Sequence, residues 1–201
     1  DVERSRGLGD VYKRQVINFD REYSIALNEK NGRDAASSIL TTVRVENNAQ
    51  LAIAPYYYFT ASIYKGECTS SRVALMTAKS SDTSLYFAEI NGEQVWKLVE
   101  NYLDHTENEF SITNQYELPI LSGMKITVQK EEDGFSLKDI TVDQEEIDKE
   151  KEYSILLTDT TRSILEKTIP GCRIKQLQDM TLSSAWTAFM EKGQQLSLIH
   201  I

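Results

Sequence analysis

The chain reads Ile90-Asn91-Gly92-Glu93-Gln94-Val95-Trp96-Lys97-Leu98-Val99-Glu100 across residues 90–100. This stretch predicts the end of a strand, a tight Asn-Gly turn and then an amphipathic helix. Asn91 has a suitable side chain to cap the helix, and Gln94, three residues later, completes a capping box. Apolar residues then recur at helical spacing, which predicts one buried stripe made of Val95, Leu98, Val99 and Tyr102.

A second segment about thirty residues later reads Leu118-Pro119-Ile120-Leu121-Ser122-Gly123-Met124-Lys125-Ile126-Thr127-Val128. It predicts a loop that delivers Ser-Gly into a strand. Around these two segments, helices are expected over 33–45 and 160–167, and a last helix is expected to open at Thr181. Strands are expected over 51–59, 61–66, 85–90, 124–129, 137–142 and 153–158. This irregular interleaving predicts an α+β fold: one domain with a mixed β-sheet and packed helices.

Composition narrows the classes of function. The formal net charge is −9, which argues against nucleic-acid binding because a phosphate backbone attracts a basic surface. No apolar run approaches the ~20 residues that span a bilayer. The cysteines, Cys68 and Cys172, lack the spacing of metal ligands and are interpreted as structural or free, with their pairing left open.

The two ends of the chain resemble translated sequencing adaptor of the kind found in metagenomic assemblies. The resemblance lies in Asp10-Val11-Tyr12-Lys13-Arg14-Gln15 and in Ser197-Leu198-Ile199-His200-Ile201. We therefore expect non-native tails at 1–15 and 197–201, a single domain over 16–196, and a fragment of a longer protein.

Few residues could support catalysis. His105 is the one histidine outside the expected tails, and it is interpreted as a solvated residue at a helix end. Ser122 lacks a Gly-x-Ser-x-Gly turn, and the chain has no glycine-rich loop of the Rossmann or Walker type. The acidic run 143–148 lacks the ligand pattern of a calcium loop and predicts a solvated turn. No catalytic residue and no metal site are assigned to this chain.

The aromatic run Tyr56-Tyr57-Tyr58-Phe59 is the strongest candidate for ligand contact. If the run is a strand, alternate rings face opposite sides, so two can be buried while two stand exposed. Exposed rings can stack on a nucleobase. The alternative is a strand packed on both faces.

Six segments, in order from Gly32 to Gln195, resemble the C-terminal, substrate-binding domain of the 5'-nucleotidase family. They are Arg33-Asp34-Ala35, 61–66, 85–100, Leu121-Ser122-Gly123, 147–153 and Asp179-Met180-Thr181-Leu182. The resemblance implies a hydrolase of nucleotide catabolism that works outside the cytoplasm. It also implies that catalysis uses two divalent metals in a separate N-terminal metallophosphatase domain, and that this chain holds no cofactor.

The departures from the family fall on its ligand-binding motifs. Tyr56-Tyr57-Tyr58-Phe59-Thr60 stands where the family has Asn-Gly-Gly-Ile-Arg, and 80–83 replaces its Pro-Phe-x-Asn loop. Thr158-Asp159-Thr160-Thr161-Arg162 replaces an Asn followed by a glycine-rich aromatic loop. One hypothesis is a divergent domain in which Tyr56, Tyr57, Tyr58, Phe59 and Arg162 contact a nucleotide or nucleoside. The alternative is a degenerate scaffold with a structural or protein-interaction role.

Overall fold

A computed structural model of the chain describes residues 16–26, 29–78, 84–104 and 112–192. Its centre is a five-stranded sheet in the order β10-β4-β9-β2-β5. These strands span Ile174–Thr181, Ser84–Asn91, Glu152–Thr158, Leu51–Ala54 and Ile120–Ser122. β2 and β9 are parallel, and the other neighbours are antiparallel. The predicted α+β fold with a mixed sheet is therefore confirmed.

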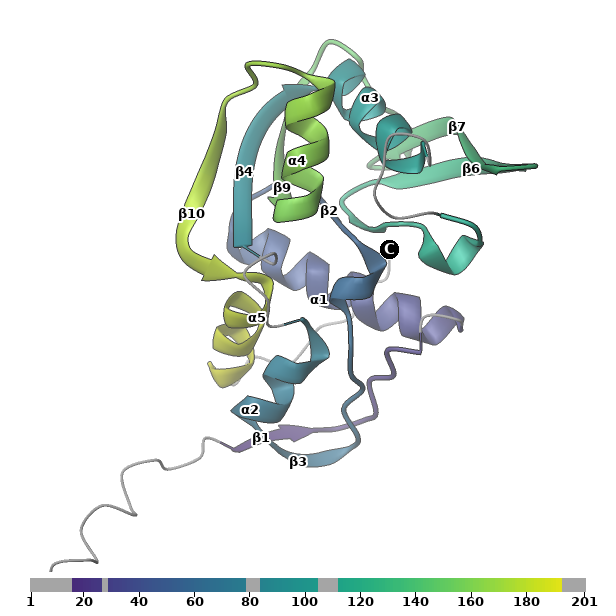
Figure 1. The fold of residues 1–201 in the computed structure, drawn as a ribbon. Coiled ribbons are helices and arrows are strands. Elements are labelled where there is room, and N and C mark those ends of the chain that lie inside the picture. Colours follow the sequence, from purple (N-terminus) through teal and green to yellow (C-terminus); the bar gives the residue numbers. More distant parts are fainter. Residues whose placement is uncertain (1–15, 27–28, 79–83, 105–111, 193–201) are drawn as a thin grey trace, which may run out of the picture.

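Helices cover both faces of this sheet (Figure 1). Helix α1 (Lys30–Glu46) lies behind it, and α5 (Leu182–Glu191) packs against α1 below the sheet. Helices α3 (Gly92–Leu103) and α4 (Asp159–Thr168) lie on the other side. The side chains of β2 point alternately to the two faces of the sheet, and helices cover both faces. Ala52 and Ala54 join the α1/α5 core, whereas Leu51 and Ile53 join the α3/α4 core. A strand buried on both faces is apolar throughout, and all four residues of β2 are buried.

The turn into α3 forms as predicted. The Asn91 side chain accepts a hydrogen bond from the Gln94 amide at 2.9 Å, and the Gln94 side chain accepts one from the Asn91 amide at 3.0 Å. Gly92 is required because a Cβ there would lie 2.1 Å from the Asp148 carbonyl oxygen. The four residues of the predicted stripe, Val95, Leu98, Val99 and Tyr102, are fully buried.

Ser122 is the last residue of β5, and Gly123 follows it on the way to β6 (Lys125–Glu131). Gly123 has φ +76°, and a Cβ would lie 2.0 Å from the Gln50 carbonyl oxygen, so a side chain is excluded on two grounds. The Ser122 hydroxyl is buried and lies 2.7 Å from Thr41 Oγ1. Ser122 is thus a structural residue that ties α1 to β5.

Two smaller sheets flank the centre. β1 (Val16–Phe19) pairs with β3 (Gly66–Thr69), and β6 pairs with β7 (Gly134–Val142), which in turn pairs with β8 (Glu145–Glu146). Within the acidic run 143–148, Asp143 and Gln144 form the expected exposed turn, with φ of 52° and 71°, and residues 145–146 then form β8. Helix α2 (Ser70–Val73) and the 3₁₀ turn η2 (Ala74–Met76) follow β3. Neither β1, β5, β10 nor α2 was predicted from the sequence.

The predicted strand 51–59 is wrong beyond Ala54. The residues Tyr56–Tyr58 form a 3₁₀ turn, η1, not a strand. Pro55 explains the difference, since it has no backbone N–H to continue the ladder and is confined to strand edges and ends. The expectation that alternate rings face opposite sides of a strand therefore does not apply to these tyrosines. Their exposure follows from the geometry of the turn.

The predicted strand 61–66 is also wrong. Among residues 61–65 only Ile63 pairs, in an isolated bridge with Tyr23 whose two backbone hydrogen bonds measure 2.8 and 3.0 Å. The chain then bends at Gly66, which has φ +112°, and the strand begins there. Glycine adopts a positive φ without strain, so the chain can bend at Gly66. The Lys65-Gly66 pair therefore marks the start of a strand and not, as predicted, its end.

Several predictions lie outside the described residues: the tails 1–15 and 197–201, His105 and the segment 80–83. Cys68 and Cys172 are both free thiols. None of the helices in the described part of the chain combines the length and the hydropathy needed to cross a bilayer.

Candidate functional site

The candidate site lies where two parallel strands end side by side. β2 and β9 are parallel neighbours, and their carboxyl ends lead into η1 and α4 respectively. Loops that follow the carboxyl ends of parallel strands form a common edge where ligands often bind. This topology therefore brings the tyrosine run and the first turn of α4, which are about a hundred residues apart, to one place.

Two tyrosine hydroxyls converge on Thr160. The Tyr58 hydroxyl lies 2.8 Å from Thr160 Oγ1, and the Tyr57 hydroxyl lies 3.2 Å from the same atom. Tyr58 is buried at 2% exposure, whereas Tyr57 keeps 38% of its surface exposed. The contact with Thr160 thus anchors the polar end of an exposed ring and holds that ring in a defined orientation.

The tyrosine rings form an edge-to-face ladder. The centroids of Tyr56 and Tyr57 are 5.5 Å apart, and those of Tyr57 and Tyr58 are 5.0 Å apart, with interplanar angles of 84° and 88°. This geometry favours contact between aromatic rings. Burial raises the pKa of Tyr56, and the charges of Glu117 and Tyr57 add to the rise. Burial also raises the pKa of Tyr102 well above its usual value, and the charges of Tyr57, Tyr56 and Tyr58 add to the rise. These phenols are therefore neutral hydrogen-bonding groups at pH 7.

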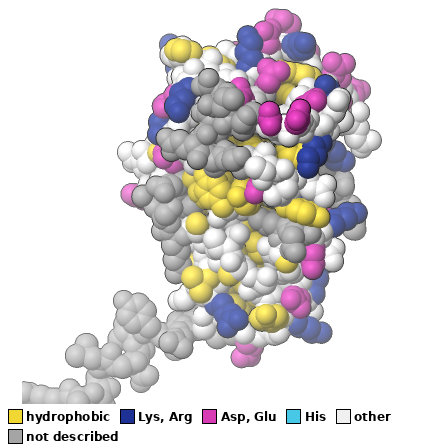
Figure 2. Space-filling model, turned by 45° about the vertical axis from the view of Figure 1, so that its right-hand side comes forward, with side chains coloured by type: hydrophobic (Ala, Val, Ile, Leu, Met, Phe, Trp, Pro, Cys, Tyr) yellow, Lys and Arg dark blue, Asp and Glu magenta, His cyan; other side chains and the backbone are white. Residues whose placement is uncertain are grey.

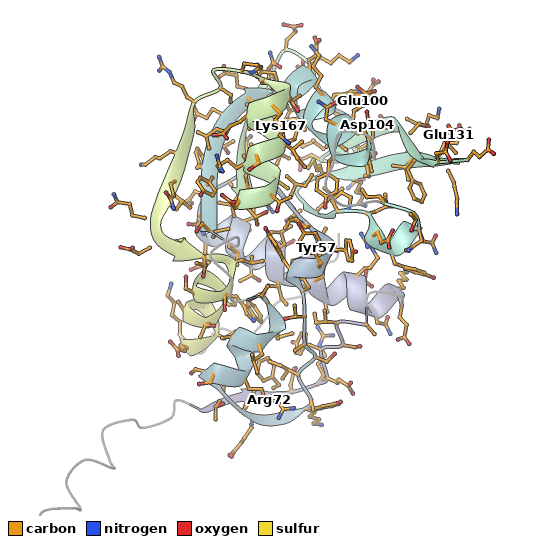
Figure 3. The ribbon with its side chains drawn as sticks, in the orientation of Figure 1. Tyr57, Arg72, Glu100, Asp104, Glu131 and Lys167 are labelled. Atoms are coloured by element: carbon orange, nitrogen blue, oxygen red, sulfur yellow. The ribbon has the colours of Figure 1, made fainter. Side chains whose placement is uncertain are left out.

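Another exposed tyrosine lies in the neighbouring 3₁₀ turn η4 (Gln115–Glu117), which packs against η1. Tyr116 is 38% exposed, as is Tyr57. Hydrophobic side chains gather in the middle of this face, with acidic side chains above them (Figure 2). Figure 3 places Tyr57 between α4 and η4. Apolar surface that gathers on one face marks a candidate site for ligand contact.

Arg33 holds the segment that carries Tyr116. Its guanidinium donates to the carbonyl oxygens of Tyr116, Leu118 and Pro119 at 3.0, 3.0 and 2.9 Å. Burial lowers the pKa of Arg33, and the nearby Tyr102 acts in the opposite direction. Arg33 belongs to α1, and its single guanidinium donates to three carbonyl oxygens in or next to η4. The position of η4 therefore depends on α1.

Arg162 is held by acidic side chains of its own helix. Its Nε donates to Asp159 Oδ1 at 3.2 Å, its Nη1 donates to Glu166, and its Nη2 lies 3.3 Å from Ser163 Oγ. The guanidinium also lies over the Tyr86 ring, 5.0 Å from the centroid. Burial lowers the pKa of Arg162, but the hydrogen bonds and charges of Glu166 and Asp159 outweigh it, so the pKa is raised.

Tyr86 completes this cluster from β4. Its hydroxyl donates to Asp159 Oδ1 at 3.0 Å. Burial raises the pKa of Tyr86, and the hydrogen bond to Asp159 raises it further. Among the residues that the structure describes, no group of three or more His, Cys, Asp or Glu side chains is arranged to hold a metal ion.

The structure brings together Tyr56, Tyr57 and Tyr58 but gives each a different exposure. Phe59 is separated from them, being buried and bridged to Thr77. Thr60, which replaces the family's arginine, donates to the Leu75 carbonyl oxygen at 2.9 Å. Arg162 lies two residues from Thr160 but is directed at carboxylates.

Sequence reasoning missed Thr160, Tyr86, Tyr116 and Arg33. For Arg162 a signal was present, because Asp159 and Glu166 stand at i−3 and i+4, the spacing of ion pairs on one helix face. The contacts of Tyr86 and Arg33 join segments that are distant in the chain, and no local pattern predicts them.

Comparison with models of protein families shows the family to which this chain belongs. The family model described as 5'-nucleotidase, C-terminal domain matches residues 11–163. The chain belongs to this family. The match to this nucleotidase family covers the tyrosine run, the Ser-Gly segment and the start of α4, which places the candidate site within the matched region.

Solved structures agree on the fold of this 5'-nucleotidase C-terminal domain. The 5'-nucleotidase precursor from Thermus thermophilus is 15% identical, with a TM-score of 0.67 over 89% of this chain and 36% of that chain. The NAD nucleotidase of Haemophilus influenzae is 16% identical, with a TM-score of 0.63 over 88% of this chain and 34% of that chain. The chain thus spans about a third of the length of these structures. A search of curated proteins found no match.

Proposed function

We propose that this chain is a divergent substrate-binding domain of a 5'-nucleotidase-like hydrolase and that it binds the nucleoside part of a nucleotide. The observation that carries the proposal is the exposed Tyr57 ring, whose hydroxyl lies 3.2 Å from Thr160 Oγ1. A half-exposed ring that is fixed at its polar end offers a stacking face for a base, and such contacts contribute about 1–3 kcal/mol per base in single-strand binders.

The surrounding groups fit a base and a sugar. Tyr56 extends the aromatic surface, and Tyr116 stands exposed in the neighbouring turn η4. The hydroxyls of Tyr57 and Thr160 can donate to or accept from ribose hydroxyls. Binding sites of this kind combine an apolar surface with a few fixed polar groups that set orientation.

The reaction itself would belong to a different part of the parent protein. We propose that an N-terminal metallophosphatase domain with two divalent metals performs hydrolysis, and that this chain supplies no metal ligand. By the same family relationship, the parent protein would act outside the cytoplasm in nucleotide catabolism.

A degenerate scaffold is the second candidate. Two observations favour it: Tyr58 and Phe59 are buried, and the Arg162 donors are taken up by Asp159, Glu166 and Ser163. In that case the fold persists for a structural or protein-interaction role without a ligand.

A thermal-shift screen of the 201-residue chain separates the two candidates. Adenosine, uridine, their monophosphates and a UDP-sugar are titrated to millimolar concentration. A ligand that binds the native state raises Tm as its concentration rises above its Kd, by mass action. A concentration-dependent rise with one or more of these ligands supports the binding domain, and no rise with any of them favours the scaffold.

Tyr57→Ala and Tyr64→Ala form a matched pair for this screen. Tyr64 is also an exposed tyrosine, at 62%, but it lies outside η1 and η4. Tyr57→Ala should weaken binding about tenfold, within the range for loss of one stacked ring. Equal affinity in both variants would place the ligand elsewhere and remove Tyr57 from the site.

A further inference from the structure

One full-length strand edge is left unpaired in the described part of the chain. β6 is the outer strand of the sheet β6-β7-β8, and no backbone hydrogen bond between described residues reaches it except from β7. Five of its seven residues are exposed, and its hairpin with β7 extends beyond the rest of the molecule (Figure 1). Such an edge presents a row of free N–H and C=O groups that can pair with another strand.

The other sheet edges in the described residues are protected against such pairing. β10 has a bulge after Gln176, with φ 56° at Asp179, and β1, β3, β5 and β8 have at most four residues each. In β7, Lys138 is an extra residue between the partners of Thr127 and Val128, and it interrupts the free edge of that strand. Bulges and short edge strands both oppose edge-to-edge pairing. β6 has neither feature.

The hairpin turn defines which backbone groups of β6 face its free edge. Glu131 and Gly134 are paired across a two-residue turn, so they hydrogen-bond to each other. In an antiparallel pair, hydrogen-bonded and non-hydrogen-bonded residue pairs alternate. β6 has no extra residue of its own, so the N–H and C=O groups of Ile126, Val128 and Lys130 point away from β7 and are open to a partner strand.

The sequence of β6 is complementary to itself in one antiparallel register. Pairing with a second β6 about Val128 uses all seven residues of both strands. By two-fold symmetry it sets Lys125 opposite Glu131 at both ends, with Thr127 opposite Gln129 between them. Opposite charges directly across an antiparallel pair stabilise it, and like charges destabilise it. Moving the centre to Thr127 or Gln129 shortens the pairing and separates both charge pairs.

Both charges are accessible for this contact. Lys125 is exposed, and none of the ion pairs between described residues includes it. The Glu131 side chain is 48% exposed and lies 4.0 Å from Lys138 Nζ, at the far end of the hairpin (Figure 3). Lysines on an edge usually oppose pairing. In this register, however, Lys125 meets a carboxylate, and the stem of Lys130 can cover Ile126 of the other copy while its ammonium stays in water.

We propose that two copies of this chain associate through β6, antiparallel and centred on Val128, to form a continuous sheet β7-β6-β6-β7. The interaction surface is the free edge of β6, and its partner is a second copy of the chain. This goes beyond the proposed function, because β6 contains none of the residues proposed to contact a nucleoside. One pair of strands buries less than the ~1,200–2,000 Å² of a standard interface, so we expect weak association that depends on protein concentration.

Sedimentation equilibrium of the 201-residue chain measures this association. The chain is compared from about 5 µM to about 500 µM, a range that covers weak dimers. Low ionic strength is used because salt screens exposed charge pairs. A rise in mass from monomer to dimer is expected. A monomer mass at every concentration overturns the proposal.

Lys125→Glu and Glu131→Lys form a charge-swap test of the register. Each variant alone sets two like-charged pairs opposite each other, so its dimer should be weaker by about tenfold or more. An equimolar mixture of the two variants should form mixed dimers as readily as the parent dimerises, because every opposed pair then carries opposite charges. The double variant K125E/E131K should dimerise like the parent for the same reason. Recovery in the mixture also shows that both single variants are folded.

Lys175→Glu is the matched control. Lys175 is also an exposed lysine on an edge strand, in β10, so this variant should dimerise like the parent. Loss of the dimer in Lys175→Glu would place the contact on β10 and overturn the proposal. Single β6 variants that dimerise as tightly as the parent, or a mixture of them that stays monomeric, would overturn it as well.

These outcomes are independent of ligand binding. A chain that dimerises through β6 without binding a nucleoside keeps this inference and loses the proposed function. A chain that binds a nucleoside but stays monomeric keeps the proposed function and loses the inference.

Discussion

Arg44 Nε donates a hydrogen bond to the Ser122 hydroxyl at 2.8 Å and thereby joins the end of α1 to the end of β5. The same guanidinium donates from Nη1 to the carbonyl oxygens of Ala49 and Gln50 at 2.9 and 3.0 Å, where the chain enters β2. One side chain thus fixes three segments at one corner of the sheet.

Ser122→Ala should destabilise the protein by about 1–3 kcal/mol, because Arg44 Nε and Thr41 Oγ1 would each lose a partner in a buried place. The free energy of unfolding is measured by urea titration. Ser136→Ala is the control, since its exposed hydroxyl also donates a short hydrogen bond, 2.7 Å to Glu131. If both substitutions lower the free energy of unfolding equally, burial of the Ser122 hydrogen bonds adds nothing to stability.

Gly123→Ala should be far more damaging than Gly171→Ala. Both glycines have positive φ, +76° and +86°, but a Cβ at Gly123 would lie 2.0 Å from Gln50 O, whereas nothing lies within 4 Å at Gly171. Gly171→Ala should lose about 1–2 kcal/mol from its backbone conformation alone. Gly123→Ala should lose that amount and at least ~2 kcal/mol more, because backbone must move to relieve the clash. Urea titration of both variants measures the difference.

Arg33→Met should loosen the segment that carries Tyr116. Three carbonyl oxygens lose their donor, and at about 1 kcal/mol for each hydrogen bond the local opening free energy falls by ~3 kcal/mol. Amide hydrogen exchange over residues 112–122 should therefore become at least about tenfold faster.

Two further variants sharpen this test. Arg33→Lys keeps the charge but loses the planar group, so it should resemble Arg33→Met. Arg72→Met, at an exposed arginine of α2, should not change exchange over 112–122. Normal protection of this segment in Arg33→Met would show that its own turn, and not α1, holds Tyr116 in place.

Glu117 should give a stability contribution that depends on pH. Burial raises its pKa, but hydrogen bonds from the Thr113 amide and hydroxyl and from the Asn114 amide outweigh this, so the folded pKa is lowered. A lowered carboxyl pKa stabilises the protein fully above the unfolded value of about 4.3, and this stabilisation is lost as pH falls through the folded value.

The variant Glu117→Gln measures this contribution. It should be about 0.5 kcal/mol less stable than the parent at pH 7, at the lower end for a helix cap because the group is partly exposed. The two proteins should converge below pH ~4. A difference that stays constant from pH 7 to pH 3 would assign the effect to shape and not to charge.

Local signals predicted the parts of the fold that depend on residues close in sequence. The Asn91 cap, the stripe of α3, the exposed turn at 143–144 and the strands β4, β7 and β9 formed as expected. Each depends on a periodicity or a turn residue that acts within a few positions. The errors at 51–66 arose where Pro55 and Gly66, two local signals, were not used to end and to begin a strand.

The sequence by itself determined the family and the class of fold. The order of helices, strands and turns follows from local patterns of apolar, capping and turn residues, and this chain retains them. Only the tertiary structure decided the character of the site. It brought the Tyr57 hydroxyl within hydrogen-bonding distance of Thr160, about a hundred residues away in the chain. It also paired the Arg162 guanidinium with the carboxylates of Asp159 and Glu166. Those outcomes depend on which side chains meet when parallel strands β2 and β9 end at one edge, and hydrogen bonds and ion pairs between distant segments leave no periodic trace in the chain.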